Sequence, residues 1–215
     1  MADALALYLA RPVRHWSAST IADAESLCAA LQPGDVLLTD GNTRMAALVR
    51  RITGSIWSHV SMYVGQLEEG PNPCCIVEAH IAEGVRAVPL SEFKGQRVRI
   101  LRPTGLHETD RRRLVDWVVS RIGAEYDLAH AWALGRRLLG LALTSRSPAV
   151  SSTMAQGATR FICSSLLAQA FLLVGYQIVP APIGVRDHGS ADYRYVTPRD
   201  FERASGFEVV KATVG

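Results

Sequence analysis

The stretch 58–101 constrains the fold most, because it holds four short strand-like segments separated by turn residues. In the first, Ser58–Gly65, apolar and polar residues alternate with the period of a β-strand. Three further segments follow at short intervals: Cys74–Ala79, Gly84–Val88 and Arg97–Leu101. Connections this short join antiparallel neighbours, whereas parallel strands need a crossover of about a dozen residues or more. The block therefore predicts an antiparallel sheet.

Helical patterns flank this block on both sides, so the chain as a whole predicts an α+β fold. The Ala/Leu-rich residues 1–32 predict an N-terminal helical extension that ends before the Pro33-Gly34 turn. No repeat or linker divides the 215 residues, so we expect a single domain over residues 1–215. The other predicted helices are Thr43–Ile52 capped by Asn42, a helix from Thr109 or Asp110 to Gly123, Leu128–Leu143, and an apolar helix beginning at Cys163.

Composition excludes several classes of protein. With 48% apolar and 20% charged residues the chain is globular, and a net charge of +3 is too small to predict a nucleic-acid partner. The longest apolar runs are shorter than the roughly 20 residues that span a bilayer, although contact with an anionic membrane surface fits the mild basic excess. Four cysteines without framework spacing, and a start without a basic segment, predict a reducing, cytoplasmic location.

Cys163 is the most informative single residue, because it opens an apolar helix. A thiol at a helix start lies at the positive end of the macrodipole, beside N–H groups that have no partner within the helix. Such a setting lowers the pKa of a cysteine and makes it nucleophilic. The sequence therefore predicts a reactive thiol at Cys163.

A histidine and a carboxylate upstream complete a nucleophile, base and orienting group. His59 opens the first strand, and Glu78 lies in the second. An imidazole titrates near neutrality and can move the thiol proton, while a carboxylate on its other nitrogen fixes the ring. His80 shares the strand face of Glu78 and is the alternative orienting residue.

At these residues the chain resembles the permuted papain-like cysteine hydrolases, the YiiX/YebB-like branch of the NlpC cell-wall-peptidase superfamily, which is related to lecithin retinol acyltransferase. The resemblance implies an antiparallel sheet or half-barrel packed by helices, circularly permuted relative to papain, so that the histidine precedes the cysteine. The segments that carry it are Pro33–Leu38, Trp57–Gly65, Val77–Ala79, Gly123–Asp127, Phe161–Leu166 and Val196–Phe201.

By this resemblance, Cys163 is the nucleophile, His59 the general base and acid, and Glu78 the orienting residue. The implied reaction is hydrolysis of an amide or ester through a covalent acyl-enzyme, without a cofactor. The expected partner is a small-molecule, peptide or lipid acyl substrate. Further candidate substrate-binding residues are Tyr126, His80, Ser164 and Asp35, of which Asp35 has the alternative role of a turn residue at a strand start.

Two other hypotheses compete with a cysteine hydrolase. His59, Glu78 and His80 supply enough donors for a metal site, but their spacing fits no helix-based zinc motif and leaves Cys163 unexplained. Alternatively, the fold is a non-catalytic module that binds a lipid or peptide. A complete Cys, His and Glu set argues against that module, because binding alone needs no nucleophile.

Overall fold

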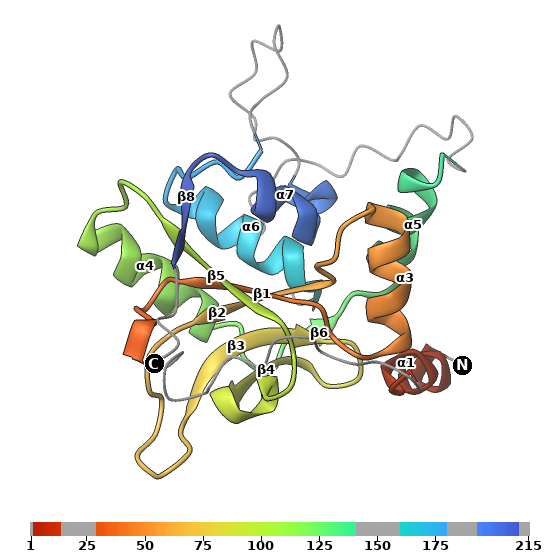
Figure 1. The fold of residues 1–215 in the computed structure, drawn as a ribbon, viewed down its shortest axis with the longest axis horizontal. Coiled ribbons are helices and arrows are strands. Elements are labelled where there is room, and N and C mark those ends of the chain that lie inside the picture. The colour runs from red at the N-terminus through yellow and green to blue at the C-terminus, as the bar shows by residue number, and fades with distance from the viewer. Residues whose placement is uncertain (1, 14–28, 141–159, 180–192, 211–215) are drawn as a thin grey trace, which may run out of the picture.

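A single six-stranded sheet forms the centre of the molecule (Figure 1). We describe it from a computed structural model that covers residues 2–13, 29–140, 160–179 and 193–210. All neighbouring strands are antiparallel, in the order β4-β3-β2-β1-β5-β8, which confirms the α+β class predicted from the sequence. The strands are β1 Val36–Thr39, β2 His59–Tyr63, β3 Cys74–His80, β4 Gly84–Pro89, β5 Val98–Pro103 and β8 Phe207–Val210.

Helices surround this sheet, and a small parallel ribbon of β6 and β7 lies beside it. None of the helices in the described ranges is long and apolar enough to cross a membrane. The helices and the ribbon strands are α1 Ala2–Ala10, α3 Arg44–Thr53, η1 Leu90–Phe93, α4 Glu108–Val119, β6 Glu125–Tyr126, α5 Leu128–Leu138, β7 Arg160–Phe161, α6 Cys163–Leu173, η2 Tyr193–Tyr195 and α7 Pro198–Arg203.

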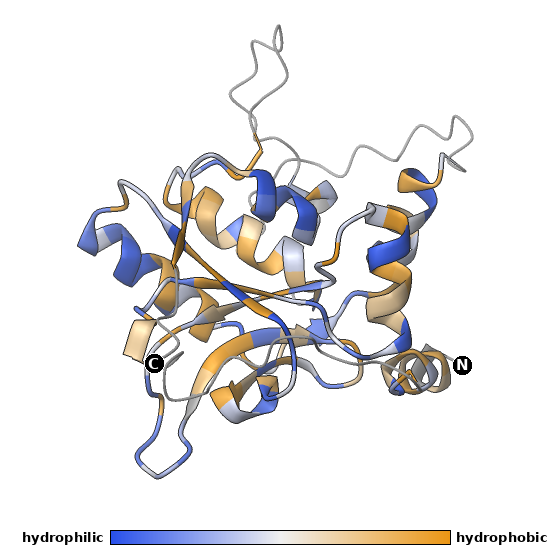
Figure 2. Cartoon of the chain, in the orientation of Figure 1, coloured by the Kyte–Doolittle hydropathy of each residue, from blue (hydrophilic) through white to orange (hydrophobic). Residues whose placement is uncertain are grey.

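Helix α6 is the centre of the larger hydrophobic core. Its sequence contains no charged residue, and it is apolar on almost all sides (Figure 2). Leu166, Leu167 and Phe171 are fully buried against one face of the sheet together with α4 and α7. Burying a leucine or phenylalanine side chain contributes about 1.5–3 kcal/mol, so this packing holds the start of α6 firmly in place.

A second apolar cluster covers the other sheet face. Leu37, Ile76 and Ile100 point into it from three strands, and Phe93 of η1 closes it. The alternation along β1, where Val36 and Leu38 face α6 while Leu37 faces η1, explains why its residues are all buried.

Several element ends differ from the sequence prediction. Thr43 rather than Asn42 caps α3, because its hydroxyl accepts a hydrogen bond from the Ala46 N–H at 3.1 Å. Helix α5 ends at Leu138 instead of Leu143. Residues 144–159, whose Ser-, Ala- and Thr-rich sequence lacks periodicity and predicts a loop, lie outside the described residues.

One tight approach fixes the β3–β4 hairpin to the ribbon. Gly84 has φ +76°, and a Cβ atom there would lie 2.2 Å from the carbonyl oxygen of Ala124. The neighbouring Val85 N–H donates to that same oxygen at 2.8 Å. Only glycine fits this contact, which places β3 and β4 against the segment leading into β6 and α6.

Candidate active site

The thiol of Cys163 lies where α6 begins. The Arg160–Phe161 strand pairs with Glu125–Tyr126, and the chain then turns into the helix at Ile162. Ser165 fixes this turn, because its hydroxyl accepts from the Ile162 N–H at 3.1 Å. The helix start predicted from the sequence is thus held by a capping interaction and by the buried helix behind it.

The ring of His59 joins this thiol to a carboxylate. Its Nε2 lies 2.8 Å from Oε2 of Glu78, and its side chain hydrogen-bonds with Cys163. Because Nε2 is engaged by Glu78, Nδ1 is the ring nitrogen left for the thiol. The three residues that the sequence nominated from β2, β3 and α6 therefore meet in one place.

The strand register explains why Glu78 reaches His59. The pairs Met62–Val77 and Tyr63–Ile76 between β2 and β3, continued toward the strand ends, set His80 opposite His59. Glu78 is then the diagonal neighbour, a position from which a long side chain can reach. The hydrogen bond to His59 comes from Glu78, and His80 instead lies 3.4 Å from Glu83.

The charges of this site stabilise one another. Burial by itself would lower the pKa of His59, but the negative charge of Cys163 and the contacts with Glu78 raise it to about 10. Burial would likewise raise the pKa of Cys163, yet the positive ring of His59 and the backbone N–H groups of Val60 and Ser164 lower it. The favoured state is a thiolate beside an imidazolium.

Arg86 is a site residue that sequence reasoning missed. Its Nε and Nη2 donate to Oε1 of Glu78 at 2.9 and 2.7 Å, while Nη1 donates to Glu83 at 2.8 Å. Glu78 thus presents one oxygen to Arg86 and the other to His59. Burial opposes the ionised form of Glu78, but His59 and Arg86 outweigh it and lower its pKa to about 2.

The remaining candidates fall in different places. Tyr126 lies close enough to Cys163 for the thiolate charge, with burial as the larger cause, to raise its pKa. Ser164 is buried directly after Cys163, and its backbone N–H donates to the sulfur. His80 lies at the edge of the site, where burial and then Arg86 lower its pKa.

Asp35 is not brought to the site. It directly precedes β1, at the end opposite Thr39, the residue that pairs with His59. Its carboxylate is fully buried and accepts from Arg102 at 2.9 and 2.7 Å and from the Gln32 N–H at 2.8 Å. These contacts match the alternative structural role at a strand start.

A metal does not fit these side chains. The part of the chain that the structure describes contains no group of three His, Cys, Asp or Glu residues placed to hold a metal ion. The donors proposed for such a site are already engaged, since Glu78 binds both His59 and Arg86.

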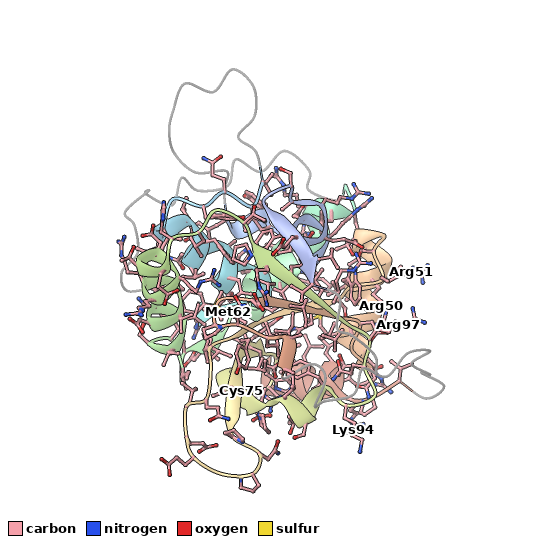
Figure 3. All side chains as sticks on the ribbon, turned by 60° about the vertical axis from the view of Figure 1, so that its left-hand side comes forward. Arg50, Arg51, Met62, Cys75, Lys94 and Arg97 are labelled. Carbon is pink, nitrogen blue, oxygen red and sulfur yellow. The ribbon has the colours of Figure 1, made fainter. Side chains whose placement is uncertain are left out.

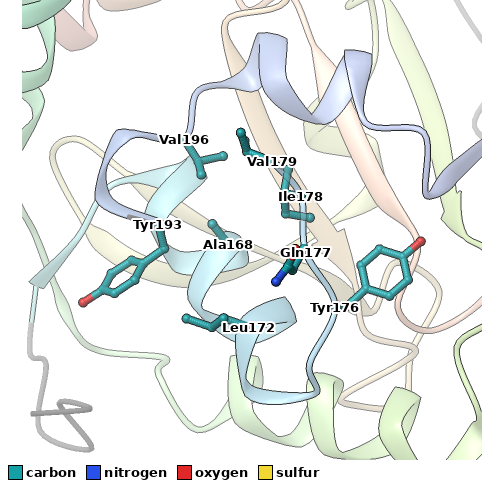
Figure 4. A pocket seen from close by; sticks show the side chains of 8 residues that line it. All are labelled: Ala168, Leu172, Tyr176, Gln177, Ile178, Val179, Tyr193 and Val196. Atoms are coloured by element: carbon teal, nitrogen blue, oxygen red, sulfur yellow. The ribbon is translucent and has the colours of Figure 1, made fainter. Parts of the chain in front are cut away.

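An apolar hollow on α6 is separate from the thiol (Figure 4). Ala168 and Leu172, about one and a half and two and a half turns beyond Cys163, line it together with Tyr193 and Val196. None of Cys163, His59 and Glu78 is among the residues that line this hollow.

Comparisons with known proteins agree with this fold. Residues 30–137, about half of the chain, match the model of the permuted papain-like amidase enzymes of the YaeF/YiiX, C92 family. The crystal structure of YiiX from Escherichia coli O157:H7, described as a metalloprotein, superposes with a TM-score of 0.56 at 17% identity. The match covers 85% of this chain and 97% of that one, and shows the shared fold.

A search of curated protein sequences gave no significant match. The family model covers β1 to α5, including His59, Glu78 and Arg86, and the structural match extends over most of the chain. The chain therefore belongs to the YaeF/YiiX, or C92, family of permuted papain-like amidase enzymes.

Proposed function

We propose that this protein is a cysteine hydrolase that cleaves an amide, or a related ester, through an acyl-enzyme on Cys163. The observation that carries the proposal is the ring of His59, hydrogen-bonded to Cys163 on one side and to Glu78 on the other. Nucleophile, base and orienting group in this mutual arrangement are the parts that acyl transfer requires.

In the first half of the reaction, the thiolate sulfur attacks the carbonyl carbon and the C=O electron pair moves onto oxygen. N–H groups at the start of α6 stabilise that oxyanion, an effect of about 2.7–4 kcal/mol per donor in mutagenesis of other enzymes. The C–N bond then breaks, and the imidazolium of His59 gives its proton to the leaving nitrogen. A thioester on Cys163 and a neutral imidazole remain.

In the second half, His59 accepts a proton from water, and the resulting hydroxide attacks the thioester carbon. The C–S bond breaks and the thiolate returns, with a carboxylic acid as product. Glu78 holds the ring in place and stabilises its charged form. Arg86 is a positioning residue, because it touches Glu78 and neither the thiol nor the ring.

Two measurements test this function. Iodoacetamide should alkylate Cys163 much faster than Cys75, which is buried in the second apolar cluster, because the lowered pKa of Cys163 increases the ionised fraction of its thiol. Equal rates would contradict the proposal.

A panel of p-nitrophenyl esters and N-acyl amides then tests turnover. Cys163→Ala should abolish hydrolysis, whereas Cys75→Ala should retain it. If wild type and both variants were equally inert but still bound acyl ligands, the non-catalytic binding module would be the better explanation.

A further inference from the structure

Helices α3 and α5 form a basic surface that contains no acidic residue. Together they carry five arginines, Arg44, Arg50, Arg51, Arg136 and Arg137, and neither Asp nor Glu. Arg51 and Arg136 are exposed, and no carboxylate among the described residues forms an ion pair with either. Arg50 and Arg51 lie at the periphery of the molecule in Figure 3. This concentration of charge contrasts with the small net charge of +3 for the chain.

Large apolar side chains are exposed among these arginines. Trp132 on α5 is 66% exposed, although tryptophan is mostly buried in folded proteins. Leu48 on α3 is also exposed, at 38%.

The side chains of Leu48 and Trp132 lie at similar positions along the two neighbouring helices. Helices α3 and α5 run in the same direction in Figure 1, and they approach closely at Gly135, where an added Cβ atom would lie 3.7 Å from Cδ1 of Ile52. Leu48 precedes Ile52 by about one turn, and Trp132 precedes Gly135 by about one turn. Arg51 follows Leu48 by three residues and Arg136 follows Trp132 by four, so each arginine shares a face with its apolar neighbour.

Helix α1 extends the same surface. Leu5, Leu7 and Tyr8 are each at least half exposed, and Ala6 is the buried residue of this helix among those described. Tyr8 is fixed beside α3, because the guanidinium of Arg44 lies 4.0 Å from its ring centre.

We propose that α1, α3 and α5 form a docking surface for an anionic lipid bilayer. Tryptophan, tyrosine and leucine side chains flanked by arginines are the combination that binds the membrane interface, where apolar tips enter the acyl region and cations meet the headgroups. A second copy of this chain is a poorer occupant, because a symmetric contact would bring the same arginines together. Helix α5 begins directly after Tyr126 and Asp127, and the Asp127 N–H donates to the Phe161 carbonyl at 3.0 Å, so the first turn of α5 lies beside the segment that leads into Cys163.

Vesicle binding tests this proposal without depending on turnover. The full-length protein is mixed with sedimenting vesicles of phosphatidylglycerol and phosphatidylcholine, or of phosphatidylcholine alone. We expect binding to the anionic vesicles that weakens with added salt, with a blue shift of tryptophan fluorescence. No binding, or equal binding to the neutral vesicles, would overturn the proposal.

Variants locate the surface. Arg51→Gln with Arg136→Gln should weaken binding about thirtyfold, from about fivefold for each arginine near an anionic surface. Trp132→Ala should weaken it about tenfold. The matched control is Arg112→Gln with Arg113→Gln on α4, at the opposite side of the molecule in Figure 1, which removes the same charge from exposed side chains.

Each outcome decides the matter. Weaker binding of the Arg51/Arg136 double variant and of Trp132→Ala to anionic vesicles, with unchanged binding of the control variant, supports the assignment. Equally weakened binding in both double variants indicates general charge attraction and overturns the assignment of this surface. Circular dichroism of all variants checks folding, and a wild-type dimer that Trp132→Ala dissociates would show that this face binds a second copy instead.

Discussion

Replacing Glu78 by Gln should lower the pKa of His59 while keeping the shape of the side chain. The Nε2–Oε2 contact is 2.8 Å long and joins two charged groups. Hydrogen bonds to charged groups contribute about 1.5–3 kcal/mol, and neutral ones about 0.5–1.5 kcal/mol. A loss of about 1–1.5 kcal/mol corresponds to about one pH unit.

The direction follows from the charge. A carboxylate beside the ring favours the imidazolium, so its removal favours the neutral ring. The pKa of His59, raised to about 10 in the wild type, should fall to about 9 in Glu78→Gln. The thiolate of Cys163 remains and is the larger of the two causes that raise this pKa, so Cys163→Ser should lower it further than Glu78→Gln does.

NMR titration of ¹⁵N-histidine-labelled protein measures this pKa directly, with His59→Gln to assign the signal. Glu83→Gln is the matched control, because Glu83 contacts Arg86 and His80 but not His59. An unchanged pKa in Glu78→Gln, or a larger fall than in Cys163→Ser, would refute the reasoning about which charges hold the imidazolium.

Three further predictions concern the surroundings of the site. Arg86→Gln should raise the pKa of Glu78 from about 2 and lower the free energy of unfolding at pH 7 by about 1–3 kcal/mol. A carboxyl group whose pKa is lowered by folding stabilises the fold at pH values above its pKa in the unfolded chain, so the loss of stability measured by urea denaturation should shrink as the pH falls from 4.5 to 2. A loss that does not depend on pH would argue against this role of Arg86. Asp35→Asn should lower the free energy of unfolding by about 2–3 kcal/mol, because it removes the charged pair with the partly exposed Arg102, and it should leave the rate of Cys163 alkylation unchanged. Slower alkylation would place Asp35 in the site after all. Gly84→Ala should lower the melting temperature more than Gly105→Ala, because both positions have positive φ but only the Cβ added at position 84 would meet a carbonyl oxygen, at 2.2 Å. Equal losses would mean that the hairpin can shift away from Ala124.

The sequence was sufficient to predict the sheet and the start of α6, because both depend on local patterns. The period-2 alternation from Ser58 onward predicts β2 and its neighbours, and the structure has them with end differences of one or two residues. A cysteine after an extended segment and before an apolar run marks the start of α6 in the same local way.

Features that depend on long-range contact were not predictable in this way. Arg86 has the sequence properties of an exposed arginine on an edge strand, and only the β3–β4 register sets it opposite Glu78. That pairing could have been found by folding the hairpin symmetrically about its turn. The exposure of Trp132 could not, because it depends on which helices leave its face of α5 uncovered.

The hydrogen bonds to Cys163 link its reactivity to the completion of folding. Glu78 and Arg86 belong to one hairpin and can pair as soon as β3 and β4 form, whereas Cys163 arrives from a segment more than seventy residues later in the chain. Until α6 packs against β2, the thiol lacks His59 and the Val60 N–H, and its pKa is that of an ordinary cysteine. In a newly synthesised chain the thiol of Cys163 is therefore not yet activated, which limits its oxidation and unwanted acylation. The rate of Cys163 alkylation during refolding measures when α6 packs against the sheet.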